Sequence, residues 1–134
     1  MKKIVLLFLT LICLISCQNS HDQTFVGTDI SSVPIDTTFR LKDFNGQIRT
    51  LEDFKGKVVV IFFGFTHCPD ICPTTLTDLK KTMALLKDKA SDVQVIFITL
   101  DPARDTEDVL KKFIPTFNSS FSGLLDQRAT LIKS

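Results

Sequence analysis

The chain has 134 residues, enough for one domain with little room for a second. Its 44% apolar and 23% charged residues are typical of a globular protein and exclude a disordered chain. The formal net charge is +1, and this balance gives no indication of nucleic-acid binding, which usually requires a basic excess.

The N-terminus is typical of a secretory signal peptide. Two lysines follow Met1, and residues 4–15 then form an apolar run too short to span a bilayer comfortably. The segment Leu14–Cys17 resembles a bacterial lipobox, which implies removal of residues 1–16 and acylation of Cys17. We therefore expect a protein that is lipid-anchored to a membrane on the exported side of the bacterial cell envelope. An ordinary cleaved signal with an incidental cysteine is the alternative.

Residues 17–37 are polar and are interpreted as a tether, followed by a single domain over 38–134. The domain opens with an alternating segment over 39–44, which predicts a half-buried strand. An Asn-Gly pair and a second strand over 47–51 complete an N-terminal β-hairpin, because both turn residues tolerate positive φ. A short helical turn over 51–56 ends at a glycine.

Strand-like and helical patterns alternate through the rest of the domain. The continuous apolar run 58–65 predicts a central strand buried on both faces. The order of strands and helices implies right-handed crossovers and a mainly parallel sheet covered on both sides, an α/β fold of the thioredoxin-like kind. The other predicted elements are a helix over 73–89, a strand over 93–100, a helix that begins at Asp105 or Thr106 and is stopped by Pro115, and a short strand over 121–125.

Cys68 and Cys72 lie at the junction of a buried strand and a helix, the sheet edge where α/β folds bind ligands. A helix start favours thiolate over thiol, and Pro69 and Pro73 restrict the loop between the sulfurs. Two such thiolates can exchange electrons as a redox dithiol, or they can hold a soft metal such as Cu(I) or Zn. A static disulfide or a pair of inert buried thiols remains an alternative on spacing alone.

Two blocks of sequence resemble the Sco/SenC family. Gly64–Pro73 closely resembles the family's cysteine signature, Asp101–Thr106 resembles its second block, and the likeness runs from about Phe39 to about Leu125. The resemblance implies a thioredoxin-like, membrane-tethered metallochaperone that helps assemble the CuA centre of cytochrome c oxidase. It implies that Cys68 and Cys72 bind copper, as Cu(I) or Cu(II), and form a redox-active disulfide. The implied partner is the copper-bearing oxidase subunit or another copper or thiol protein.

The family uses a downstream histidine as its third copper ligand, and this chain contains only His21 and His67. His21 falls in the tether and is expected to be solvated. His67 belongs to the cysteine block, where its counterpart is not the usual ligand, although imidazole suits copper. His67 and Asp101 are candidates to support the cysteines by hydrogen bonding. For Asp105 we expect a helix cap instead, and for Arg104 an ion pair with aspartate.

A helical pattern begins at Asp126 without a C-cap or a following strand. Together with the missing histidine, this predicts a domain that is incomplete at its C-terminus, weakly stable and weak in copper binding. The family's final antiparallel hairpin would be absent, which would leave an apolar sheet edge uncovered.

Two enzymatic readings compete with copper binding. A thiol-disulfide oxidoreductase of the envelope would use the same two sulfurs, although such reductases typically carry Cys-x-x-Cys. A peroxidase of the peroxiredoxin type requires a PxxxTxxC pattern. Ile61 and Phe65 occupy the Pro and Thr positions relative to Cys68, and Phe65 and Pro69 occupy them relative to Cys72, so neither cysteine fits.

Overall fold

The structure is a computed structural model that describes residues 27–34 and 38–126. The chain divides into two units, Met1–Asp36 and Thr37–Ser134. The predicted signal peptide, Cys17, most of the tether and the helix expected after Asp126 lie outside the described residues. No helix in the described segments is both long and apolar enough to cross a membrane.

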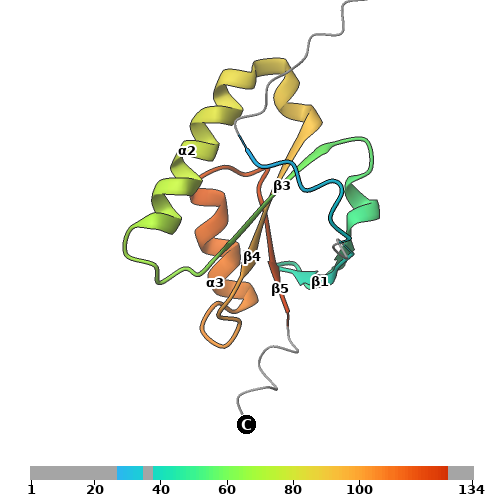
Figure 1. The fold of residues 1–134 in the computed structure, drawn as a ribbon. Coiled ribbons are helices and arrows are strands. Elements are labelled where there is room, and N and C mark those ends of the chain that lie inside the picture. Colours follow the sequence, from blue (N-terminus) through green and yellow to red (C-terminus); the bar gives the residue numbers. More distant parts are fainter. Residues whose placement is uncertain (1–26, 35–37, 127–134) are drawn as a thin grey trace, which may run out of the picture. The chain divides into compact units, whose positions relative to one another are not determined.

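The second unit is built on a five-stranded sheet with the order β2-β1-β5-β4-β3 (Figure 1). Strands β3, β4 and β5 are parallel, and the N-terminal hairpin joins β5 through antiparallel pairing of β1. The α/β class, the parallel core and the leading hairpin predicted from the sequence are therefore confirmed. The strands are β1 Arg40–Asp43, β2 Ile48–Thr50, β3 Val58–Gly64, β4 Val93–Thr99 and β5 Ser122–Leu125.

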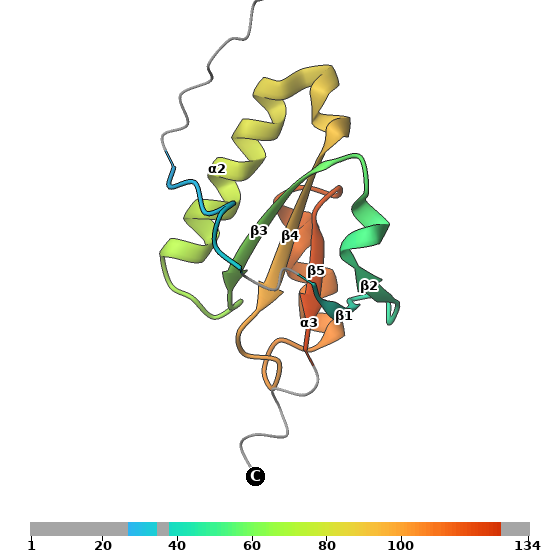
Figure 2. The same ribbon diagram turned by 45° about the vertical axis from the view of Figure 1, so that its right-hand side comes forward.

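The two α-helices in the described residues lie on the same face of the sheet. Helix α2, Ile71–Leu86, connects β3 to β4, and α3, Glu107–Phe113, connects β4 to β5. The strand order advances in one direction, so two right-handed crossovers place both helices on one side, as Figure 2 also shows. The described part of this unit also contains three 3-10 segments: η1 Leu51–Phe54, η2 Lys87–Asp92 and η3 Ile114–Thr116, the last of which contains Pro115.

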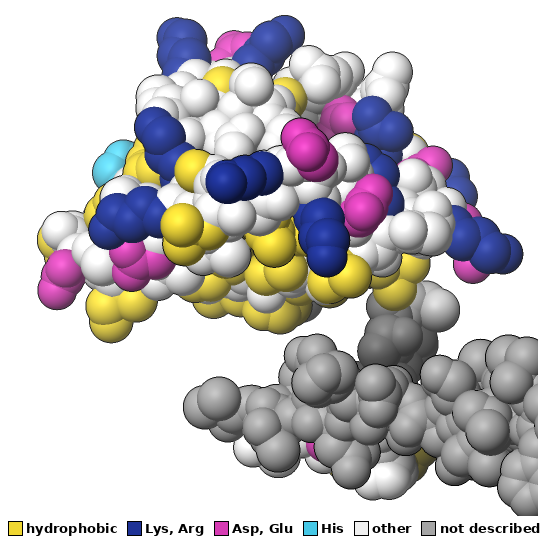
Figure 3. Space-filling view, turned by 90° about the horizontal axis from the view of Figure 1, so that it is seen from above, with side chains coloured by type: hydrophobic (Ala, Val, Ile, Leu, Met, Phe, Trp, Pro, Cys, Tyr) yellow, Lys and Arg dark blue, Asp and Glu magenta, His cyan; other side chains and the backbone are white. Residues whose placement is uncertain are grey.

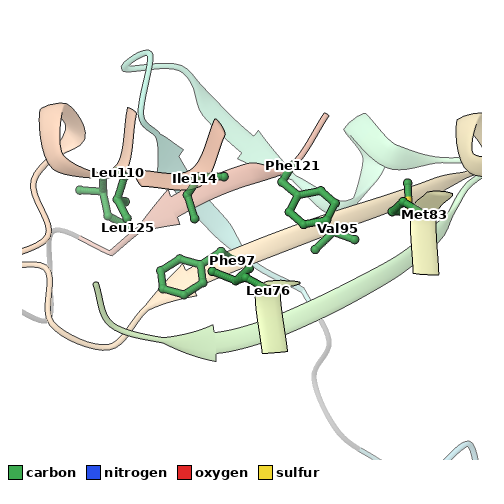
Figure 4. Close-up of a cluster of buried hydrophobic side chains, with 8 residues drawn as sticks. All are labelled: Leu76, Met83, Val95, Phe97, Leu110, Ile114, Phe121 and Leu125. Carbon is green, nitrogen blue, oxygen red and sulfur yellow. The ribbon is translucent and has the colours of Figure 1, made fainter. Parts of the chain in front are cut away.

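The main hydrophobic core lies between the helices and the sheet (Figure 4). Side chains of β4 alternate between the two faces, with Phe97 in the main core and Ile96 in a smaller cluster on the opposite face. On that opposite face, Phe54 of the 3-10 segment η1 packs against side chains of the sheet that include Leu41 of β1. The main core comprises Leu76, Met83, Val95, Phe97, Leu110, Ile114, Phe121 and Leu125.

The prediction that 58–65 forms a central strand buried on both faces is wrong. Strand β3 is the edge strand and pairs only with β4 within the described residues. Ile61 and Phe63 point away from the helices and are 39% and 58% exposed. Figure 3 shows hydrophobic side chains gathered along one side of the domain. An apolar run indicates a demand for burial, but it does not say which neighbours are present to satisfy that demand.

Two helix starts differ from the predictions. Helix α2 begins at Ile71 rather than at Pro73, so Cys72 belongs to its first turn instead of to the preceding loop. Thr106 caps α3, because its hydroxyl accepts a hydrogen bond from the N–H of Val109. Asp105, the other candidate cap, instead accepts hydrogen bonds from Thr66 and Thr99.

Candidate metal centre

Cys68 and Cys72 lie close together at the connection between β3 and α2. Cys68 lies in the loop, half-buried, and its N–H donates to the carbonyl of Phe65 at 3.3 Å. Cys72 sits in the first turn of α2 and is only 5% exposed. Both are free thiols. The N–H of Cys72 lies 3.4 Å from Cys68 Sγ, so the helix start closes directly on the first sulfur.

The start of α2 favours the thiolate form of Cys68. The backbone N–H of Asp70 is the main cause, joined by the N–H and thiol of Cys72 and by the N–H of Ile71. These donors hold the pKa of Cys68 below its usual value, despite a small opposing effect of desolvation. The sulfur thus occupies the position at which a helix N-terminus stabilises an anion.

Cys72 is shifted in the opposite direction. Burial is the main cause that raises the pKa of Cys72, and the negative charges of Cys68 and Asp105 add to it. An N–H bond from Phe65 offsets only part of this rise. Cys68 therefore ionises more readily than Cys72. A soft cation beside both sulfurs would displace the thiol protons to solvent, because metals bind thiolates.

Gly64 provides the space for Cys72. A Cβ atom at Gly64 would lie 2.8 Å from Cε2 of Phe97, closer than real Cβ contacts, and 3.0 Å from Cys72 Sγ, which is tighter than most of them. Gly64 is buried at the end of β3. The sequence pattern alone does not predict a role for Gly64. The signal that could have found it is a glycine that ends an apolar strand just before the cysteine loop.

Asp105 is a fully buried carboxylate beside the cysteine loop, so the expectation of a helix cap is wrong. Its oxygens accept hydrogen bonds from the N–H of Thr66 at 2.9 Å, from the hydroxyl of Thr99 at 2.6 Å and from the hydroxyl of Thr66. Thr66 follows β3 and Thr99 ends β4. Because β3 and β4 are parallel, their C-terminal ends lie at the same edge of the sheet. The sequence predicts this shared edge but not the contact of Asp105 with Thr66 and Thr99.

His67 and Asp101 lie at the same edge. His67 is 57% exposed, and its Nδ1 lies 3.1 Å from the hydroxyl of Thr66. Asp101 forms the expected ion pair with Nε of Arg104. Within the described ranges, no three His, Cys, Asp or Glu side chains cluster closely enough to hold a metal ion. Support of the cysteines by His67 or Asp101 therefore stays a prediction.

The model of the SCO1/SenC family matches residues 28–131, more than three quarters of the chain. The chain belongs to the SCO1/SenC family. Among curated relatives, the mitochondrial protein SCO2 of Saccharomyces cerevisiae is 47% identical over 94 residues, which cover 69% of this chain and 31% of the yeast protein. The SCO2-like protein of Rickettsia felis is 43% identical over 93 residues, and 45% of its length is covered. This chain thus spans from 31% to 45% of the length of these relatives.

Solved structures of family members share the fold and confirm its thioredoxin-like α/β architecture. The copper-bound structure of Bradyrhizobium japonicum ScoI is 39% identical, with a TM-score of 0.66 over 74% of this chain and 63% of ScoI. A SCO1/SenC family lipoprotein from Bacillus anthracis is 32% identical, with a TM-score of 0.62 over 71% and 58% of the two chains. BsSco, described as having a disulfide switch and belonging to a family of cytochrome c oxidase assembly proteins, is 28% identical, with a TM-score of 0.59 over 71% and 57%.

Proposed function

We propose that this chain is a copper-binding metallochaperone that carries Cu(I) between Cys68 and Cys72 and delivers it to the copper-bearing subunit of cytochrome c oxidase. The observation that carries the proposal is the closure of the α2 start on Cys68, with Cys72 N–H at 3.4 Å from the sulfur. Two sulfurs held together in this way are suitable donors for a soft cation. Copper-bound ScoI, which shares the fold at 39% identity, supports copper as the cargo.

The two sulfurs also give the site a redox gate. Oxidation of Cys68 and Cys72 joins them in a disulfide and releases two electrons and two protons, which removes both thiolate donors. Copper binding therefore requires the reduced pair. The disulfide switch ascribed to BsSco supports this part of the proposal, and the lowered pKa of Cys68 makes it the sulfur that attacks an external disulfide first.

The test of copper binding uses the full chain, reduced and titrated with Cu(I) under anaerobic conditions against a competing chelator. One equivalent should bind, with copper–sulfur bonds visible in X-ray absorption. Cys68→Ala and Cys72→Ala should each weaken binding by about 100-fold or more, since even groups that only orient a metal ligand cost about 10–100-fold. Cys17→Ser is the matched control and should bind normally. No copper–sulfur bond in the reduced protein would overturn the proposal, and rapid turnover of a disulfide substrate without copper would support the oxidoreductase instead.

We further propose that acylation of Cys17 anchors the domain at the membrane of the cell envelope, with residues 17–37 as its tether. The Leu14–Cys17 segment and the B. anthracis lipoprotein support this proposal. Cell fractionation should find the wild-type chain with membranes and the Cys17→Ser variant released from them, because several acyl chains are needed for firm anchoring. Membrane retention of Cys17→Ser would contradict the anchor.

A further inference from the structure

Asp105 joins the two loops that follow β3 and β4. The carboxylate is 0% exposed and accepts from both the N–H and the hydroxyl of Thr66, and from the hydroxyl of Thr99. The Thr99 hydroxyl in turn accepts from the N–H of Asp101 at 3.0 Å, and the N–H of Asp105 donates to the carbonyl of Asp101 at 2.9 Å. Losing a donor would leave the buried carboxylate unsatisfied at a cost in free energy. This cost keeps Thr66 and Thr99 in position.

The anchoring continues into the residue beside the first sulfur. The Thr66 hydroxyl has a single proton, and its bond to Asp105 uses that proton. The 3.1 Å contact between Thr66 Oγ1 and His67 Nδ1 then requires the histidine nitrogen to be the donor. Asp105 thereby orders Thr66 directly and His67 through Thr66, and Cys68 is the next residue. On the other side, Cys72 is fixed by the first turn of α2.

We infer that Asp105 is a positioning residue for the cysteine pair, acting through Thr66 to hold the Cys68 side of the loop against the helix start. This inference rests on the proposed function for its biological meaning, but its physical content concerns the two sulfurs alone. Preorganised sulfurs behave as if at high effective concentration, which favours both a shared metal ion and an intramolecular disulfide. Without the anchor, the loop must first be ordered at the cost of conformational entropy.

The charge of Asp105 also acts on Cys72, so the effects of geometry and charge have to be separated. Its negative charge helps to raise the pKa of Cys72 and therefore disfavours the thiolate there. Asp105→Asn removes the charge together with part of the anchor. Thr66→Val keeps the charge of Asp105 and removes the Thr66 hydroxyl with its contacts to Asp105 and His67. Thr66→Ser restores that hydroxyl. Positioning predicts a loss in the first two variants and rescue in the third.

The experiment measures the equilibrium between the dithiol and the disulfide in the full chain. Mixtures of glutathione and glutathione disulfide drive the exchange, in which the two thiols are oxidised to one disulfide and one glutathione disulfide is reduced to two glutathione molecules. Alkylation traps the result, and mass spectrometry reads it on the tryptic peptide of residues 58–80, which contains only Cys68 and Cys72. Asp105→Asn and Thr66→Val should each lower the disulfide equilibrium constant by about tenfold, the scale set by loss of a hydrogen bond to a charged group. Thr66→Ser should match the wild type.

Asp43→Asn is the matched control, because Asp43 is also a buried, hydrogen-bonded aspartate but lies in the hairpin. It should leave the disulfide constant unchanged even where it lowers stability. If Thr66→Val matches the wild type, or if Asp105→Asn shifts the constant no more than Asp43→Asn, the inference is wrong. Should Asp105→Asn not fold, Thr66→Val alone decides. A wild type that fails to bind Cu(I) defeats the proposed function but leaves this redox readout valid, so the two failures are distinguishable.

Discussion

The two sulfurs of the site differ in their ionisation, which gives a prediction at the scale of single residues. Donors at the α2 start lower the pKa of Cys68, whereas burial raises the pKa of Cys72. Iodoacetamide should therefore modify Cys68 first, with a rate that rises with pH through a midpoint below the usual thiol pKa of about 8.5. Cys72→Ala removes one of the donors and should move that midpoint upward. Mass spectrometry of the 58–80 peptide measures both rates, and equal rates at neutral pH would contradict the asymmetry.

Gly64 should tolerate no side chain. Gly64→Ala places a Cβ atom 2.8 Å from the Phe97 ring and 3.0 Å from Cys72 Sγ, and both of these neighbours are buried. We expect a loss of about 1–3 kcal/mol in the free energy of unfolding, the usual cost of overpacking. Gly27→Ala, which meets nothing within 4 Å, is the control and should change stability little. Denaturant unfolding of the two variants gives the comparison, and equal stability would show that the strand end can relax.

At this scale the sequence predicts which two sulfurs lie together better than it predicts their surroundings. Cys68 and Cys72 are expected to lie close together because they are four positions apart at a strand-to-helix junction, and the start of α2 does close on Cys68. The sequence predicts a helix cap at Asp105 because a carboxylate just before a helix normally caps it. Its actual partner, Thr66, is 39 positions earlier in the chain, and the local sequence does not show that the two residues are in contact. The role of Gly64 could not be predicted, because the space that a Cβ atom would need is filled by Phe97, which belongs to another strand.

At the scale of elements, β3 and β4 have nearly the same sequence pattern but different surroundings. Phe97 of β4 is 0% exposed and packs at 5.7 Å from Phe62 and 6.3 Å from Phe113, measured between ring centroids. Phe63 of β3 is 58% exposed. Phe97→Ala should lower the free energy of unfolding by about 3–5 kcal/mol, whereas Phe63→Ala should change it by about 0.5 kcal/mol or less. Comparable losses in the two variants, measured by denaturant unfolding, would mean that β3 is covered in solution.

The type and order of the elements were predictable because apolar runs, the Asn-Gly turn and Pro115 are local signals. Which strands lie next to each other in the sheet was not predictable. A run such as Val58–Gly64 is equally suited to the centre of a sheet and to an edge, and the strand order that decides between them depends on pairings between residues far apart in the chain. The observed start of α2 is two residues earlier than the predicted one, because Ile71 and Cys72 are as compatible with a loop as with a first helical turn.

At the scale of the whole domain, the N-terminal hairpin is attached to the sheet through β1, and Asp43 organises it. Its carboxylate accepts from the N–H groups of Asn45 and Gln47 and from Nε of Arg49, each at 2.9 Å. Desolvation is the largest single influence and raises the pKa of Asp43, but the bonds from Gln47, Arg49 and Asn45 together outweigh it and the pKa is lowered. β1 also pairs with β5 on its other side, so loosening the hairpin weakens an edge of the parallel core.

A lowered carboxyl pKa stabilises the folded state above the unfolded pKa of about 3.9, and this contribution is lost as the pH falls through the folded pKa. Asp43→Asn should therefore cost about 1.5–3 kcal/mol of unfolding free energy at pH 7, the scale of hydrogen bonds to a charged group. The difference between wild type and variant should shrink as the pH drops below about 3.9, because the wild-type carboxyl becomes neutral as well. Denaturant unfolding of both proteins across this range tests the sign. A difference that stays constant with pH would mean that the hairpin is held by the shape of the Asp43 side chain rather than by its charge.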